Sequence, residues 1–71
     1  MKNGTVLKKV TVWHQNGMSE LALPTGAVRW EIQGDVGTYR SVRFIAVYAD
    51  GTIAKFVEYG SGHWLRYEAT A

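Results

Sequence analysis

The sequence predicts an all-β domain of five or six short antiparallel strands, built as a small barrel or a twisted sheet that associates with itself. Short runs rich in β-branched and aromatic residues recur along the chain, and turns containing glycine separate them. An apolar helical pattern at i, i+3, i+4 and i+7 persists nowhere. The 71 residues carry no linker or repeat, so residues 1–71 are expected to form a single small domain.

Strands are expected where apolar residues alternate with polar ones between turns. In the first half of the chain, the runs with this pattern are residues 8–13, 19–23 and 27–33. A turn at Asn16-Gly17 joins the first two runs. Residues 1–5, before the first run, are polar and expected to fray.

The strongest local signal is a hairpin between residues 42 and 59. Two apolar runs flank Asp50-Gly51, a dipeptide typical of two-residue type I′ turns. Such a turn places Ala49 opposite Thr52 and fixes the register outward from there. One face then carries Val42, Phe44, Tyr48, Ile53, Val57 and Tyr59, and the other carries Ile45, Val47, Ala49, Ala54 and Phe56.

Both faces of this hairpin are apolar, so each needs a cover from the rest of the chain or from another chain. A domain of 71 residues has little material to cover both faces. We therefore expect a homo-oligomer, at least a dimer, that buries one face of the hairpin or a strand edge.

A last strand is expected at residues 63–69, after the turn Gly60-Ser61-Gly62. If Leu65 and Tyr67 face inward, Trp64 and Arg66 share the outer face. The alternative is that Trp64 belongs to the core and Arg66 is merely solvated, and we favour this alternative slightly.

Composition and charge limit the class of protein. Eight Lys and Arg against six Asp and Glu give a net charge of +2, which suits an ordinary soluble surface about as well as a polyanion-binding one. The absence of cysteine excludes disulfides and thiolate metal sites. We find no signal-peptide pattern and no apolar run of transmembrane length. These features predict a cytoplasmic protein without a membrane partner.

Two short motifs resemble those of a family of small uncharacterised bacteriophage proteins. They are Leu23-Pro24-Thr25-Gly26-Ala27 and, after the hairpin, Gly60-Ser61-Gly62-His63. The resemblance covers roughly residues 9–63, although Ser61 stands where the family usually has Thr. It implies an all-β fold and a viral setting, in which the chain acts in the host cytoplasm, and it implies no activity or site.

Catalytic and metal sites are not expected. His14 and His63 are far apart in the sequence and no cysteine accompanies them, whereas a zinc site needs three or four ligands at matched spacing. No nucleophile elbow or oxyanion motif surrounds Ser61, and the carboxylates show no pairing for acid–base work. We therefore expect a protein that is not an enzyme and holds no metal or cofactor.

Aromatic and basic residues near the turns are the candidate binding residues. The set is Trp64, Arg66, His63, Gly60, Ser61, Gly62, Trp13, Arg40 and Tyr39. A Trp beside an Arg is typical of interface hot spots, and Gly60-Ser61-Gly62 could hold an anion, although a plain turn is favoured there. The expected function is capture or inhibition of a host protein, with inhibition of a defence system as one use, or capture of a small anionic ligand. The alternative is single-stranded nucleic-acid or nucleotide binding by the aromatic and Arg side chains.

Overall fold

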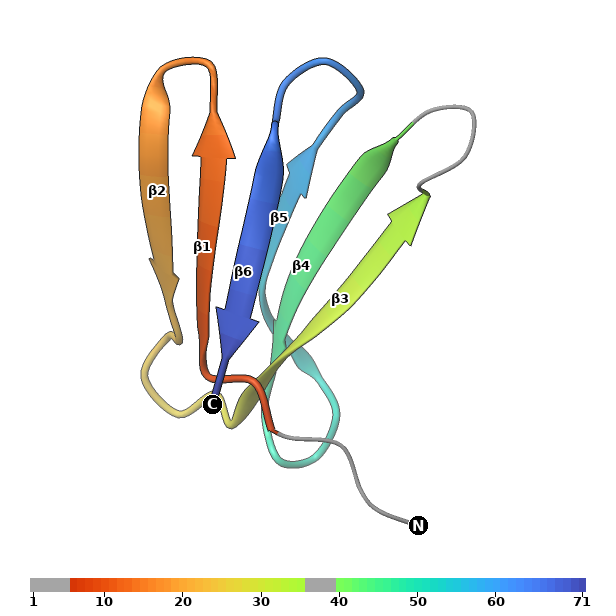
Figure 1. The fold of residues 1–71 in the computed structure, drawn as a ribbon. Helices are drawn as coiled ribbons and strands as arrows, with labels where there is room; N and C mark the ends of the chain where they lie inside the picture. Colours follow the sequence, from red (N-terminus) through yellow and green to blue (C-terminus); the bar gives the residue numbers. More distant parts are fainter. Residues whose placement is uncertain (1–5, 36–39) are drawn as a thin grey trace, which may run out of the picture.

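Two three-stranded antiparallel sheets face one another in the computed structural model, which describes residues 6–35 and 40–71 (Figure 1). The strands are β1 (Lys9–His14), β2 (Gly17–Ala22), β3 (Arg29–Asp35), β4 (Ser41–Val47), β5 (Ile53–Tyr59) and β6 (Arg66–Thr70). The described residues contain no helix. The all-β prediction is confirmed with six strands, and the twisted-sheet form of it fits.

The described strands do not close into a barrel, because the edge strands β2 and β6 of one sheet do not pair with the edge strands β3 and β5 of the other. One sheet has the order β2-β1-β6 and the other has the order β3-β4-β5. A hydrogen bond joins the two layers near the start of β1. Leu7, just before β1, forms an isolated antiparallel bridge with Trp30 of β3, and the Trp30 N–H donates to the Leu7 carbonyl at 2.8 Å. The central strands β1 and β4 thus lie in opposite layers.

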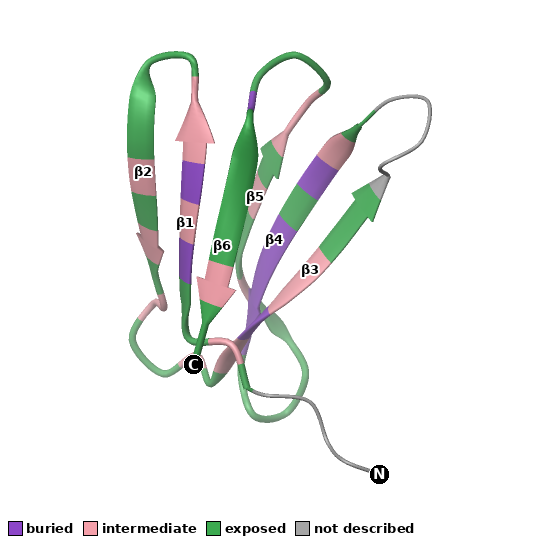
Figure 2. Cartoon of the chain, viewed as in Figure 1, coloured by how far each residue is buried: buried purple, intermediate pink, exposed green. Residues whose placement is uncertain are grey.

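The core lies between the two sheets and draws mainly on their central strands. Val10 and Val12 of β1 and Phe44 of β4 are fully buried, and Figure 2 shows the buried bands on these two strands. Alternation explains the pattern, because every second side chain of a strand points to the same face. The remaining members of the buried cluster are Trp30, Val42, Ala46 and Trp64.

The β4–β5 hairpin differs from the prediction at its tip. The Tyr48 N–H donates to the Thr52 carbonyl at 2.9 Å, and the Gly51 N–H donates to the Tyr48 carbonyl at 2.9 Å. The loop therefore has three residues, and Gly51 has a φ of +90° whereas Asp50 is not in the left-handed region. The predicted two-residue type I′ turn is wrong, because that turn needs positive φ at both central residues.

A shift between Ala46 and Val47 compensates for the longer loop. The predicted register is confirmed from Val42 opposite Tyr59 to Ala46 opposite Lys55. Val47 then pairs with Ile53 and leaves Ala54 as the extra residue of a β-bulge. Because of this bulge, Ile53 joins the outer face and Ala54 packs against the core, the reverse of the predicted faces.

Candidate binding site

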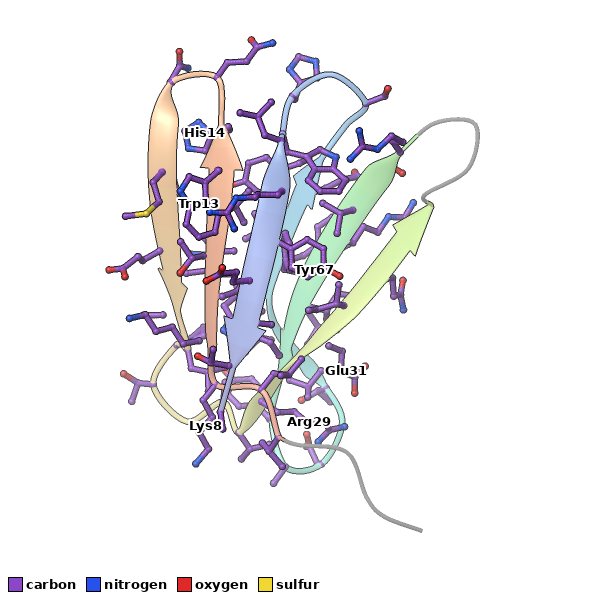
Figure 3. All side chains as sticks on the ribbon, in the orientation of Figure 1. Lys8, Trp13, His14, Arg29, Glu31 and Tyr67 are labelled. Atoms are coloured by element: carbon purple, nitrogen blue, oxygen red, sulfur yellow. The ribbon has the colours of Figure 1, made fainter. Side chains whose placement is uncertain are left out.

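The predicted binding residues gather at one end of the sandwich. There the β1–β2 turn, the β5–β6 connection and the start of β4 lie together, at the top of Figure 1. The Gln15 side-chain amide donates to the Gly62 carbonyl at 3.0 Å and so ties two of these segments to each other. Tyr39, one of the predicted residues, lies outside the described residues. Figure 3 shows Trp13 and His14 at this end.

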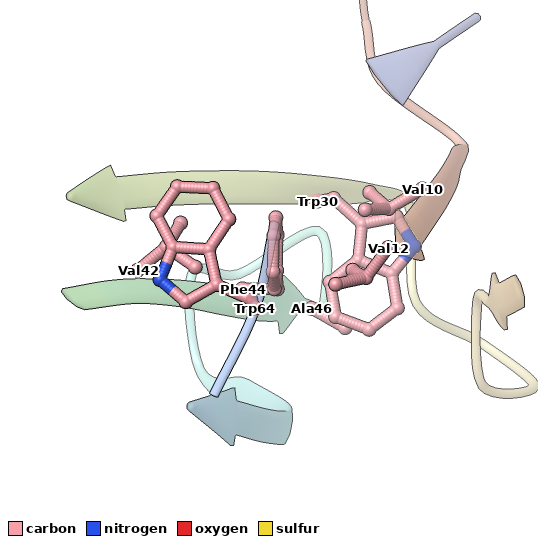
Figure 4. Close-up of a cluster of buried hydrophobic side chains, with 7 residues drawn as sticks. All are labelled: Val10, Val12, Trp30, Val42, Phe44, Ala46 and Trp64. Carbon is pink, nitrogen blue, oxygen red and sulfur yellow. The ribbon is translucent and has the colours of Figure 1, made fainter. Parts of the chain in front are cut away.

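Trp64 faces the core instead of the outer surface. Its side chain is 8% exposed, and Figure 4 shows it in the buried cluster with Val42 and Phe44. The indole Nε1–H donates to the Arg40 carbonyl at 2.7 Å. Arg40 has a φ of 47°, and its guanidinium lies 5.0 Å from the centre of the Trp64 ring.

Of the two alternatives for this segment, the outer pair of Trp64 and Arg66 is therefore wrong. Strand alternation was assumed from His63 onward, but β6 begins only at Arg66. The chain before Arg66 is not extended along the sheet, so Trp64 can turn inward while Arg66 points outward. The favoured alternative, in which Trp64 is a core residue, is what the structure shows.

Arg66 pairs with a different tryptophan. Its guanidinium carbon lies 3.7 Å from the centre of the Trp13 ring, and its Nη1 donates to Glu68 Oε2 at 3.1 Å. The β1–β6 register places Arg66 directly beside Trp13, on the face of the β2-β1-β6 sheet that points away from the core. A cation against an aromatic face contributes about 0.5–1 kcal/mol at an exposed site.

Two exposed apolar residues neighbour this pair, Met18 across the strand register and Leu65 next to Arg66 in the chain. Met18 of β2 lies opposite Trp13 in the register and is 55% exposed. Leu65 is 63% exposed, and its backbone N–H donates to the Trp13 carbonyl at 2.7 Å. We call Trp13, Met18, Leu65 and Arg66 the Trp13 surface. Met18 and Leu65 were not among the predicted residues, and the β1–β2 pairing across the Asn16-Gly17 turn was the sequence signal that could have placed Met18 there.

The turn Gly60-Ser61-Gly62 is a closed β-turn in the structure. The His63 N–H donates to the Gly60 carbonyl at 3.1 Å, and Gly62 has a φ of +83°. The His63 N–H is therefore used within the turn. The Arg66 guanidinium is directed onto Trp13 and Glu68 rather than toward this turn.

His14 is held in a structural role by its neighbours. Its Nδ1 accepts the Asn16 N–H at 3.3 Å, so Nε2 carries the proton and donates to Ser19 Oγ at 2.8 Å. The ring also stacks on Tyr59 with centroids 6.2 Å apart. Within residues 6–35 and 40–71, no group of three or more His, Asp or Glu side chains could hold a metal ion.

The surroundings of the Trp13 surface are balanced in charge. Lys9 pairs with Glu20 at 3.2 Å on the same outer face, and Arg66 pairs with Glu68. These pairs leave no excess of positive charge beside Trp13, and Arg66 already covers one face of its ring. Both features favour a protein partner over the stacking of nucleobases.

Comparisons of this chain with protein-family models, with curated proteins and with solved structures found no match. The part of the chain that the structure describes has no helix long and apolar enough to cross a membrane.

Proposed function

We propose that this chain is a non-enzymatic binding protein that captures a protein partner through the Trp13 surface. The observation that carries the proposal is the contact between Trp13 and Arg66, flanked by the exposed Met18 and Leu65. Trp and Arg are enriched among the residues that dominate interface energetics.

The geometry also lowers the entropy lost on binding. Arg66 is held between the Trp13 ring and the Glu68 carboxylate, so its long side chain is already ordered before a partner arrives. Immobilising a flexible side chain costs about 0.5–1.5 kcal/mol, and a pre-ordered one avoids part of this cost. The resemblance to small bacteriophage proteins extends the proposal to a host protein as partner, with inhibition of a defence protein as one use.

The test is affinity capture from bacterial lysate with four immobilised chains, read by mass spectrometry. The chains are the parent, Trp13→Ala, Arg66→Ala and the control Lys55→Ala, which changes an exposed cation outside the Trp13 surface. We expect one protein to be retained by the parent and the control and lost from the two Trp13-surface variants. Circular dichroism checks that each variant is folded.

A fluorescent single-stranded oligonucleotide tests the alternative. Under the proposal it does not bind at physiological salt. Tight binding that weakens steeply with added salt and is lost in Arg66→Ala would overturn the proposal in favour of nucleic-acid binding, because released counterions give such binding its salt dependence.

A further inference from the structure

The face of the β3-β4-β5 sheet that points away from the core carries an ordered pattern of apolar and charged side chains. The strand registers arrange it in three rows, each read from β3 through β4 to β5. The rows are Arg29, Val47 and Ile53, then Glu31, Ile45 and Phe56, then Gln33, Arg43 and Glu58. We call these nine residues the outer β4 face, and Figure 3 labels two of them, Arg29 and Glu31.

This face is more apolar than a solvated sheet face. Phe56 is 51% exposed and Ile53 is 59% exposed. Ile45 and Val47 lie on the central strand outside the cluster between the sheets, and their own chain already covers them, since they are 8% and 3% exposed. The apolar surface that a partner could cover therefore belongs to Ile53 and Phe56. An antiparallel sheet with one wet face normally shows polar side chains there, so this arrangement points to a protein contact.

Charged side chains frame the apolar centre in two pairs of opposite sign. Arg29 donates to Glu31 at 2.7 Å, and Arg43 donates to Glu58 at 3.1 Å. All four side chains are about half exposed, so they can accept a further partner from above the sheet. A face with equal numbers of both charges is suited to a second copy of itself.

We propose that two copies of this chain dimerise through the outer β4 face. The two-fold axis lies between the two sheets, directly above Ile45, and runs parallel to the sheets at about 45° to the strands. Such an axis stacks the two sheets face to face with their strands nearly perpendicular, a recognised packing class with sheets about 10 Å apart. If each strand is taken as a column of the pattern, this axis places the rows of one copy over the columns of the other. Strand spacing and rise then bring each residue within about 3 Å, laterally, of its counterpart.

The contacts that this axis creates match in both charge and polarity. Arg29 meets Glu58 of the second copy, and Glu31 meets Arg43 of the second copy. Val47 meets Phe56 of the second copy. Ile45, Ile53 and Gln33 each meet their own equivalent. Every charged side chain therefore gains an opposite charge, and the two exposed apolar side chains, Ile53 and Phe56, gain an apolar neighbour.

The other simple two-fold axes do not give this match. An axis parallel to the strands places Glu31 over Phe56, and one perpendicular to the strands places Glu31 over Glu31. The opposite diagonal places Arg29 over Arg29 and Glu58 over Glu58. Like charges across an interface suppress association, so the pattern selects one arrangement of the dimer.

The size of the face sets the expected strength. Nine residues a side is fewer than the roughly 20–30 of a standard stable interface, so the dimer should form at micromolar or higher concentration. Analytical ultracentrifugation from micromolar to millimolar concentration should show a shift from the 7.9 kDa chain toward twice that mass. A chain that stays monomeric throughout this range overturns the proposal.

Two charge reversals test the axis itself. Glu31→Arg brings two arginines together across the interface, and Arg43→Glu brings two glutamates together. Each variant alone should dimerise at least about tenfold more weakly than the parent. Mixed in equal amounts, the two variants should form a heterodimer, because the new arginine of one then faces the new glutamate of the other.

The matched control is Glu20→Arg on the opposite sheet. It breaks the Lys9 ion pair of similar exposure, and it should leave the dimer unchanged. Reversals that leave the dimer intact would exclude the outer β4 face as the interface. Failure of the folded variants to pair when mixed would exclude this axis. Loss of the dimer in the control alone would move the interface to the Trp13 side of the sandwich.

Discussion

The two tryptophans at the loop end are expected to respond in opposite ways to truncation. Trp64 is buried and hydrogen-bonded through Nε1 to the Arg40 carbonyl, whereas Trp13 lies on the outer face beneath Arg66. Replacing a buried Trp by Ala costs about 3–5 kcal/mol, because it removes the burial and leaves a cavity. Trp64→Ala should therefore lose a large part of the stability of a chain that, at this length, totals roughly 4–11 kcal/mol.

Trp13→Ala should be much milder in its effect on folding. It removes a cation–π contact worth about 0.5–1 kcal/mol and some burial, and it leaves no internal cavity. Trp64→Phe is the matched intermediate, since it keeps an aromatic ring but loses the hydrogen bond to Arg40, for a cost of about 1 kcal/mol from that bond.

Urea unfolding followed by far-ultraviolet circular dichroism measures all three variants. Circular dichroism is preferred to fluorescence because each variant removes a fluorophore, and one protein concentration is kept because self-association shifts the midpoint. The expected order of stability is parent, Trp13→Ala, Trp64→Phe and Trp64→Ala. If Trp64→Ala unfolds at the same urea concentration as Trp13→Ala, the placement of Trp64 in the core is wrong.

Two further predictions concern the tip of the β4–β5 hairpin. Gly51→Val should destabilise the chain by about 1–3 kcal/mol through backbone strain, since Gly51 has a φ of +90°. Nothing lies within 4 Å of an added Cβ, so the Cβ itself meets no clash. Gly51→Asn should destabilise the chain less, and equal thermal midpoints for Val and parent would contradict the assigned turn. The Asp50 carboxylate accepts the Thr52 N–H and hydroxyl, which lowers the pKa of Asp50 below its ordinary 3.8. The ionised Asp50 carboxylate therefore stabilises the folded chain above pH 3.8, and this stabilisation is lost as the pH falls through the lowered pKa. Asp50→Ala should flatten the acid limb of a plot of thermal midpoint against pH.

Most of the hairpin register could be predicted from the sequence although it was counted from a turn of the wrong type, because the bulge at Ala54 offsets the extra residue of the loop. Arg43 opposite Glu58 is an ion pair in the structure, as the register required. The bulge could not be predicted, since both faces of the hairpin are apolar. Moving Ile53 from one apolar face to the other violates no pattern, so alternation carried no information at that position.

The candidate site was predictable only in part, because it depends on a long-range pairing. Trp13 and Arg66 were both expected as binding residues, but their contact follows from β6 joining β1, which no local signal specifies. The less favoured interpretation placed Trp64 on the outer face, and it is wrong for a local reason. The strand begins after it, and three residues of irregular chain are enough to reverse the alternation.

The two proposed surfaces lie on opposite faces of the sandwich, and this has a consequence for binding. A dimer formed through the outer β4 face would leave both Trp13 surfaces uncovered and pointing away from each other. Two such surfaces cannot both contact one flat patch of a single partner molecule. They can bind two separate partner molecules, or two subunits of one partner assembly that wraps around the dimer. When they bind one assembly, the first contact holds the other Trp13 surface close to its subunit, so the remaining contact forms at high effective concentration. Arg43→Glu, which should weaken the dimer without touching the Trp13 surface, would then lower the apparent affinity for an oligomeric partner and leave the affinity for its isolated subunit unchanged.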